Sequence, residues 1–313
     1  MEQSMYNSIA EVLQDVAAGR LTPEQADLEI ERLGADTGAP FEDVENVVTD
    51  ALGVPFEHVE DAQDGAAPEE ARPSSAPREK RSGITGIYGG NVNFDVNGSL
   101  TGIIGGCICE GVTIEGNISG PVGGPIKRGA HITGSISGPI GGAIHEDVRI
   151  DGNISGAIGG AIHKGVRIGG NISGAIGGSI AQGVEIVGNI SGVIGGPLRG
   201  HVHGTVSGPI GGSMDGVIDG SCFGVIGGSL NGTVGGDVGN RHNNLRKSVK
   251  GDIRGTVGGS VYGKVMGSVY GRIEGDVHEI YGDIKEGAYI GGRVDILHGR
   301  NHGTVMGGIV KMR

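Results

Sequence analysis

Aliphatic residues recur every four positions through much of the chain, and in its central part this spacing lies within an 18-residue repeat. The unit reads Gly-Val-x-Ile-x-Gly-Asn-Ile-Ser-Gly-x-Ile-Gly-Gly-x-Ile-x-x. Good copies start at Gly111, Gly129, Asp147, Gly165 and Gly183, and a partial copy starts at Asn93. A short repeat of constant length is typical of solenoids, in which each unit covers its neighbour. The pattern predicts a mostly β fold, a glycine-rich β-solenoid over residues 85–313.

The steps between aliphatic positions predict the form of each coil. From Val148 to Val166 the steps are two residues and then four times four residues. Side chains alternate along a strand with a period of two, so residues four apart face the same side. Glycine at midway positions such as Gly156 predicts corners or close contacts that exclude a Cβ atom. The predicted core is a narrow stack of isoleucines: Ile118, Ile136, Ile154, Ile172 and Ile190.

The repeat shortens after residue 200. Gly208 begins a motif that returns 16 residues later at Gly224, and from Ile253 the pattern becomes an almost pure tetrapeptide. The 18-residue unit is therefore four tetrapeptides with a two-residue extension. If one repeat is one coil, residues 85–313 form roughly 13 coils and a rod roughly 60 Å long at ~4.8 Å per coil.

Asparagine recurs at one position of the repeat, at Asn117, Asn153, Asn171 and Asn189, with Ser135 in the remaining copy. If the coils stack, these side chains lie one above another. We expect their amides to form a hydrogen-bonded ladder along the rod.

Residues 1–61 carry a different pattern, which predicts a small acidic α-helical module. Apolar residues have helical spacing within residues 5–18, and Thr22-Pro23-Glu24-Gln25 has the features of a helix start. A third helix is expected to begin near Pro40. The module is interpreted either as a folded cap on the rod or as a docking head with a protein partner. Its candidate contact residues are Phe41, Val44, Val48, Leu52 and Phe56.

Residues 62–84 are rich in proline, alanine, serine and charge, and they lack an apolar period. This composition predicts a disordered linker. Charge also divides the chain at this point. Residues 1–82 hold 19 acids and 6 bases, whereas residues 83–313 hold 17 acids and 18 bases. The acidic balance, without a dense basic stripe, argues against nucleic acid as a partner.

Two resemblances follow from these features. The segment Ile9–Leu33, with its Gly19-Arg-Leu-Thr-Pro-Glu-Gln-Ala26 core, resembles a helical hairpin that precedes β-solenoids in a family of bacterial adhesin-type proteins. The rod resembles bactofilin-type polymer-forming solenoids in the length of its coils. These resemblances imply a helical module attached to a β-rod, and an interaction role. They imply no catalytic residue.

Motifs that suggest a metal or a cofactor are weak. Gly258–Lys264 copies the start of a phosphate loop, but Val265 stands where Ser or Thr is needed. His145 and His163 are one repeat apart and are expected to stack, without a third ligand. His201 and His203 are expected to alternate faces of a strand and so not to converge. We therefore predict no cofactor and no metal site.

The three cysteines, Cys107, Cys109 and Cys222, are expected to be reduced packing residues. No signal peptide and no stretch of about 20 apolar residues is visible. These features favour a cytoplasmic protein, or one associated with a virion or an envelope by assembly.

The favoured function is a non-enzymatic structural protein, a self-assembling or particle-associated scaffold. The apolar stretch Val305–Val310 suggests that rods stack through their ends, and the acidic head could meet the mildly basic residues 241–313 of a neighbour. The alternative is a surface adhesin or a phage tail-fibre-type protein, whose rod contacts a receptor or a glycan and could consist of three intertwined chains. An enzyme is least favoured, because no nucleophile, base and orienting residue can be placed together.

Overall fold

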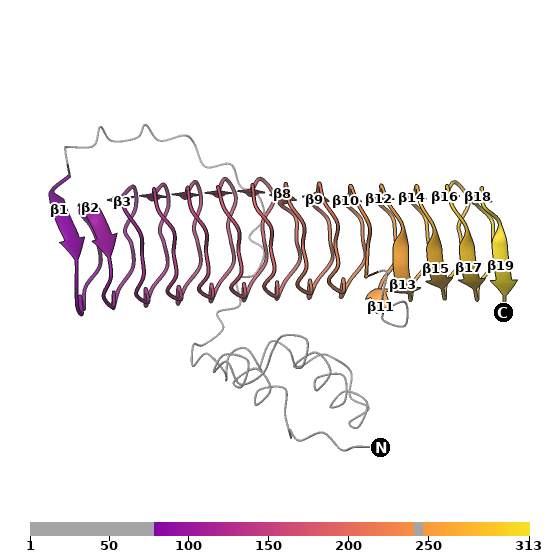
Figure 1. Cartoon of the computed structure of the whole chain (residues 1–313), viewed down its shortest axis with the longest axis horizontal. Helices are drawn as coiled ribbons and strands as arrows, with labels where there is room; N and C mark the ends of the chain where they lie inside the picture. The colour runs from indigo at the N-terminus through magenta and orange to yellow at the C-terminus, as the bar shows by residue number, and fades with distance from the viewer. Residues whose placement is uncertain (1–77, 241–246) are drawn as a thin grey trace, which may run out of the picture. The chain divides into compact units, whose positions relative to one another are not determined.

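The computed structural model describes residues 78–240 and 247–313. Within these residues the chain forms a rod of stacked parallel coils (Figure 1). The prediction of a mostly β solenoid is confirmed. The helical module predicted for residues 1–61, with Phe41, Val44, Val48, Leu52 and Phe56, lies outside the described residues.

All the strands pair in parallel, in two sheets. The larger sheet has 14 short strands. In sheet order they are β1 (Lys80–Ile84), β2 (Asp95–Leu100), β3 (Thr113–Glu115), β4 (His131–Ile132), β5 (Arg149–Ile150), β6 (Arg167–Ile168), β7 (Glu185–Ile186), β8 (His201–Val202), β9 (Val217–Ile218), β10 (Thr233–Val234), β12 (Thr256–Val257), β14 (Arg272–Ile273), β16 (Tyr289–Ile290) and β18 (Thr304–Val305). The smaller sheet contains β11 (Lys247–Val249), β13 (Val261–Val265), β15 (Val277–Ile280), β17 (Val294–Leu297) and β19 (Ile309–Met312).

Each coil has four sides, because four rows of backbone pairs run along the rod. One row is the larger sheet, in which Ile114 pairs with Ile132. The other three rows begin as isolated bridges, represented by Ile118 with Ile136, Val122 with Ile140, and Ile126 with Ile144. Steps of four residues therefore carry the chain from one side to the next. With 14 strands in the larger sheet and ~4.8 Å between neighbouring strands, the rod is about 60 Å long.

The aliphatic residue at the centre of each side points into the coil. The predicted core stack forms one continuous row of parallel bridges, and each of its members is fully buried: Ile118, Ile136, Ile154, Ile172 and Ile190. Similar rows from the other sides complete a thin aliphatic core.

The two-residue extension of the 18-residue coils is a turn. Its second residue has a positive φ in five consecutive coils, at Gly111, Gly129, Asp147, Gly165 and Gly183. Glycine adopts this left-handed conformation at little cost, and Asp tolerates it better than most residues. The residue after the turn adds a second buried side chain to that corner: Val112, Ala130, Val148, Val166 and Val184. The positive-φ residues of these turns are the positions at which the sequence repeats begin.

Two features of the chain differ from the sequence-based expectation. The rod begins before residue 85, because β1 pairs with β2 and so uses the last five residues of the predicted linker. The rest of that linker up to residue 77 lies outside the described residues. Each described coil is also closed by this chain alone, through the pairs of all four rows. The coil therefore needs no intertwined partner chains.

Candidate functional surfaces of the rod

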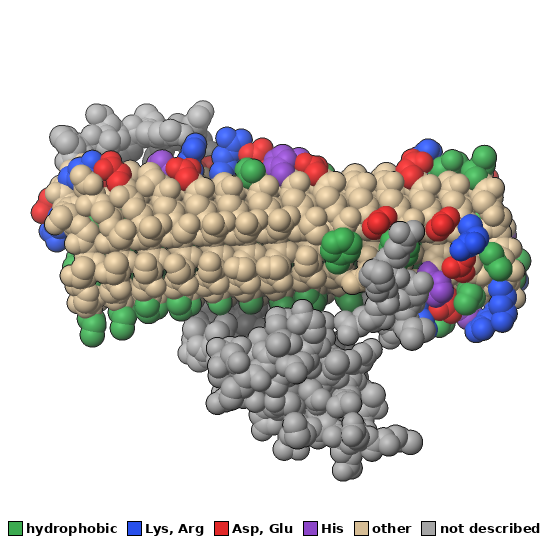
Figure 2. All heavy atoms as spheres, in the orientation of Figure 1, with side chains coloured by type: hydrophobic (Ala, Val, Ile, Leu, Met, Phe, Trp, Pro, Cys, Tyr) green, Lys and Arg blue, Asp and Glu red, His purple; other side chains and the backbone are tan. Residues whose placement is uncertain are grey.

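The rod carries a broad uncharged surface along its first coils. In eight consecutive coils, a segment of 11 residues contains no Asp, Glu, Lys or Arg. The segments are 98–108, 116–126, 134–144, 152–162, 170–180, 188–198, 204–214 and 220–230. These stretches form three of the four sides, so charged side chains gather along the remaining edge, at the top of Figure 2.

Within this surface, one exposed or half-buried apolar residue per coil forms an apolar ridge. The ridge lies on the side opposite the larger sheet and is seen as a row of hydrophobic side chains along the lower edge of the rod in Figure 2. Two of its residues, Ile87 and Val193, are 82% and 44% exposed to solvent. The ridge comprises Ile87, Ile103, Pro121, Pro139, Ala157, Ala175, Val193, Pro209 and Val225.

Glycine flanks the ridge on both sides. In the coil around Pro121, for example, Gly120 precedes the ridge residue, and Gly123 and Gly124 follow the buried Val122. Beyond these glycines lies a second row of small residues. The glycines between the two rows carry no side chain. The second row comprises Cys107, Pro125, Ala143, Ala161, Ser179, Pro197 and Ser213.

The uncharged surface and its ridge end after the coil that contains Val225. After Val225 the ridge position is taken by Ser248, Lys264 and Glu279, which are polar or charged. Lys264 Nζ lies 3.6 Å from a carboxylate oxygen of the buried Glu279.

We did not predict the ridge from the sequence. The signal was available there, because charges are confined to one part of each repeat.

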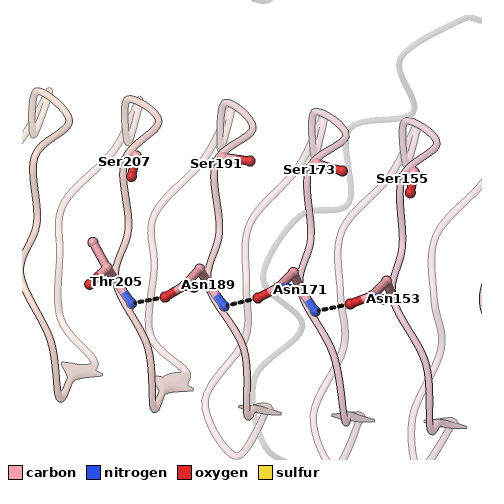
Figure 3. A pocket seen from close by; sticks show the side chains of 8 residues that line it. All are labelled: Asn153, Ser155, Asn171, Ser173, Asn189, Ser191, Thr205 and Ser207. Atoms are coloured by element: carbon pink, nitrogen blue, oxygen red, sulfur yellow. Dashed lines mark hydrogen bonds between the residues drawn. The ribbon is translucent and has the colours of Figure 1, made fainter.

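A row of polar side chains links successive coils on a neighbouring side. Asn153 Oδ1 accepts a hydrogen bond from the backbone N–H of Asn171, and Asn171 does the same for Asn189, both at 2.7 Å (Figure 3). Ser135 fits into the row because its hydroxyl accepts from the Asn153 N–H at 3.0 Å. The row contains Ser99, Asn117, Ser135, Asn153, Asn171, Asn189 and Thr205.

The structure changes the predicted form of this ladder. The bonds join side-chain oxygens to backbone N–H groups, and not one side-chain amide to the next. The physical reason is that the backbone N–H at this corner, as at Asn171, does not bond to a backbone carbonyl, so a side-chain oxygen from the adjacent coil accepts its hydrogen bond. Any short acceptor serves, which explains why Ser alternates with Asn.

The same device continues towards the C-terminal coils with Ser and Asp. Asp237, Ser260 and Asp276 extend the row, and a second row runs on the opposite side through Ser213, Ser229, Asp252, Ser268 and Asp283. The backbone N–H of Arg300, and then Lys285, hold the pKa of the Asp283 carboxyl below its usual range. A lowered carboxyl pKa stabilises the fold above the unfolded value of about 4, and this stabilisation is lost as the pH falls through the lowered pKa.

Replacing Asn171 by alanine is expected to lower the free energy of unfolding by about 1 kcal/mol, because the Asn189 N–H loses its acceptor at a partly hydrated site. Hydrogen exchange at the Asn189 amide should speed up, as measured by mass spectrometry or NMR. Asn171→Ser is the matched control, since Ser135 fills this role naturally, and it should restore most of the protection. Equal exchange in the alanine and serine variants would contradict the role given to the side-chain oxygen.

Along the charged edge, side chains pair between adjacent coils. His131 Nε2 lies 2.9 Å and Arg149 Nε lies 2.6 Å from separate oxygens of Asp151. Arg167 forms an ion pair with Glu185 in the next coil. These groups are exposed and so contribute little to stability individually.

Two histidines converge on this edge, and the prediction that His201 and His203 alternate faces is wrong. Residues two apart in a strand lie on the same face, and Val202 between them is buried. Their ring centroids are 4.0 Å apart. His201 Nε2 and His203 Nδ1 lie 2.8 Å and 2.9 Å from the two oxygens of Asp219. The bond from His201, and then that from His203, lower the pKa of the Asp219 carboxyl.

The histidine pair His145 and His163 and the three cysteines lie apart from the His201–Asp219 cluster. The rings of His145 and His163 stack at 5.1 Å, as the repeat predicted. Burial, and then His163, lower the pKa of His145. Cys107 Sγ and Cys109 Sγ lie 3.7 Å apart, and all three cysteines are free. Burial raises the pKa of the Cys222 thiol to about 12, so Cys222 acts as a packing residue in the core.

These features define the described part of the chain as a parallel β-solenoid with four-sided coils, an uncharged surface and one charged edge. No protein-family model, curated protein or solved structure matches the chain. Within residues 78–240 and 247–313, no helix has the length and apolar character that a membrane crossing needs.

Proposed function

We propose that the chain is a non-enzymatic structural rod that assembles side by side with copies of itself through the apolar ridge. The observation that carries the proposal is the ridge together with the uncharged surface around it, which extends over eight coils. A regular apolar stripe of this length, free of charge, is typical of a surface that another molecule covers.

A second copy of the chain is the occupant that fits the ridge best. The ridge repeats once per coil, so two copies have the same spacing of about 4.8 Å per residue along their lengths. One copy therefore matches another in register over all of these coils. Each copy also has glycines beside its ridge, and their lack of side chains leaves room for side chains of the other copy. A partner surface with a different spacing would lose this register after a few coils.

Charge restricts the way in which two rods can meet. The charged edge lies opposite the ridge, so packing ridge against ridge leaves the exposed ion pairs in water. This arrangement avoids the desolvation cost of burying charged groups. A docking head, as predicted for residues 1–61, would give such a scaffold a separate protein partner.

Replacing Val193 by glutamate is expected to weaken association of the full-length protein at least about tenfold, because the contact would bury an unpaired charge. Sedimentation velocity over a concentration series, with negative-stain electron microscopy, measures the effect. Val187→Glu is the matched control. Val187 is another exposed valine of the same repeat, at 59%, but it lies on the charged edge.

The control variant should associate like the natural protein. A natural protein that stays monomeric at all concentrations would remove the proposal. Equal weakening by the two glutamate variants would show that net charge, and not the ridge, governs association.

The row of Asn and Ser side chains favours a second candidate function, binding of a glycan. A shallow groove is lined by Asn153, Ser155, Asn171, Ser173, Asn189, Ser191, Thr205 and Ser207 (Figure 3). Repeated amides and hydroxyls at regular spacing suit the hydroxyls of an extended polysaccharide. A glycan array with the full-length protein tests this candidate, and a triple variant of Ser155, Ser173 and Ser191 to alanine should lower any binding found. If no glycan binds, self-assembly remains as the proposed function of the rod.

A further inference from the structure

We propose that His201, His203 and Asp219 form a binding site for a divalent transition-metal ion of the zinc class. Among the residues that the structure describes, this is the one group of three His, Cys, Asp or Glu side chains that lie close enough together to share a metal ion. The three candidate ligand atoms all lie within 4.8 Å of one another. Two imidazoles and one carboxylate are a common protein ligand set for zinc.

The solenoid places these side chains without any specialised loop. His201 belongs to β8, and Asp219 directly follows β9. The register pairs His201 with Val217 and Val202 with Ile218, which brings His203 beside Asp219 in the next coil. Backbone bonds of 3.0 Å from Val217 N to Gly200 O and 2.9 Å from Asp219 N to Val202 O fix the two coils. The metal would therefore connect adjacent coils at a preformed position.

The distances require only small side-chain movements. Ligand atoms about 2.1 Å from a tetrahedral zinc ion lie about 3.4 Å from one another. The two histidine nitrogens are now 2.8 Å and 2.9 Å from the carboxylate oxygens. The three side chains are between 36% and 46% exposed, so their rotamers can open by about half an ångström to admit the ion. Such an ion keeps at least one position for water or for a ligand from another molecule.

A related cluster on the same edge shows what makes this site different. Asp151 also has two side-chain partners, but they are His131 from the preceding coil and Arg149 from its own coil. A guanidinium has no lone pair to offer a metal, so this cluster has only two donors. In both clusters the Asp directly follows a strand of the larger sheet, after β5 at Asp151 and after β9 at Asp219. Asp151 is therefore a built-in control for Asp219.

The choice of ion follows from the donors. Imidazole nitrogen suits Zn²⁺, Ni²⁺ and Cu²⁺, whereas Mg²⁺ prefers oxygen ligands. Protons compete with the metal for the imidazole nitrogens, so binding should weaken on acidification. Because the ion would bind the folded coils and not the unfolded chain, it should also stabilise this part of the rod.

Isothermal titration calorimetry of the full-length protein with zinc chloride at neutral pH tests the proposal. We expect saturable binding that is weakened at least about tenfold by His201→Gln with His203→Gln, and likewise by Asp219→Asn. Asp151→Asn should bind zinc like the natural protein, and magnesium chloride should give no binding. These variants replace exposed side chains, and circular dichroism checks that each one is folded.

Two results would overturn the site. One is an absence of zinc binding by the natural protein. The other is zinc binding by the double histidine variant with unchanged affinity, which would place the ion elsewhere. Hydrogen exchange gives a second readout, since zinc should slow exchange in residues 201–219 of the natural protein and leave the double variant unaffected.

Discussion

Gly156→Ala is expected to lower the free energy of unfolding by at least about 3 kcal/mol, through overlap between neighbouring coils. A Cβ atom on Gly156 would lie 2.1 Å from the carbonyl oxygen and 2.3 Å from the carbonyl carbon of Gly138. Both are backbone atoms, and they cannot move away as a flexible side chain can. Backbone bonds such as that from Ser155 N to Ile136 O, at 2.8 Å, hold the two coils together on this side.

Urea unfolding followed by circular dichroism measures the loss, and hydrogen exchange locates it, with faster exchange expected around residues 138–174. Gly89→Ala is the control, because a Cβ atom at Gly89 would meet no atom within 4 Å. It should change stability by less than about 0.5 kcal/mol. Equal urea midpoints for the two variants would mean that the coils are not as closely stacked as the structure describes.

Ile154→Ala is expected to lower the free energy of unfolding by about 2–5 kcal/mol, because it removes buried methyl groups and leaves a cavity. Ile154 is fully buried and is bridged to Ile136 below and Ile172 above. The backbone ladders on all four sides prevent the coil from closing around the space. With aromatic residues at only 3% of the chain, the aliphatic stack supplies most of the buried volume.

Ile154→Val should cost only about 0.5–1.5 kcal/mol, since it removes one methylene group. Val187→Ala, at an exposed position, should change stability by less than about 0.5 kcal/mol. Stability depends mainly on contacts between neighbouring coils in a repeat protein, so the loss should appear as faster hydrogen exchange in residues 136–172. An effect of Ile154→Ala no larger than that of Val187→Ala would contradict the role of the stack.

The repeat made much of the rod predictable. A four-residue step between aliphatic positions is readable directly in the chain, and it corresponds to one side of the coil. The positions where repeats begin, such as Gly129 and Asp147, are turns with positive φ. The start of the rod was less predictable, because Lys80–Ile84 has the polar composition of a linker and owes its strand form to pairing with β2.

The candidate sites depended more on three-dimensional contacts. The sequence indicated that Asn153, Asn171 and Asn189 form a row, but the acceptor role of their side chains depends on where the neighbouring N–H points. The apolar ridge combines single residues from nine coils, such as Ala175 and Val193, and no local stretch is apolar enough to draw attention. His203 and Asp219 are 16 residues apart, and only the register of the coils brings them together.

The sequence by itself determined the solenoid, the length of its coils and its aliphatic core, because a periodic pattern of burial has few structural solutions. Only the tertiary structure decided which side chains lie next to each other across coils. A change from 18 to 16 residues per coil shifts every later alignment by two residues, and that shift places Asp219 beside His203. Contacts along the rod depend on this register, whereas the fold depends only on the period.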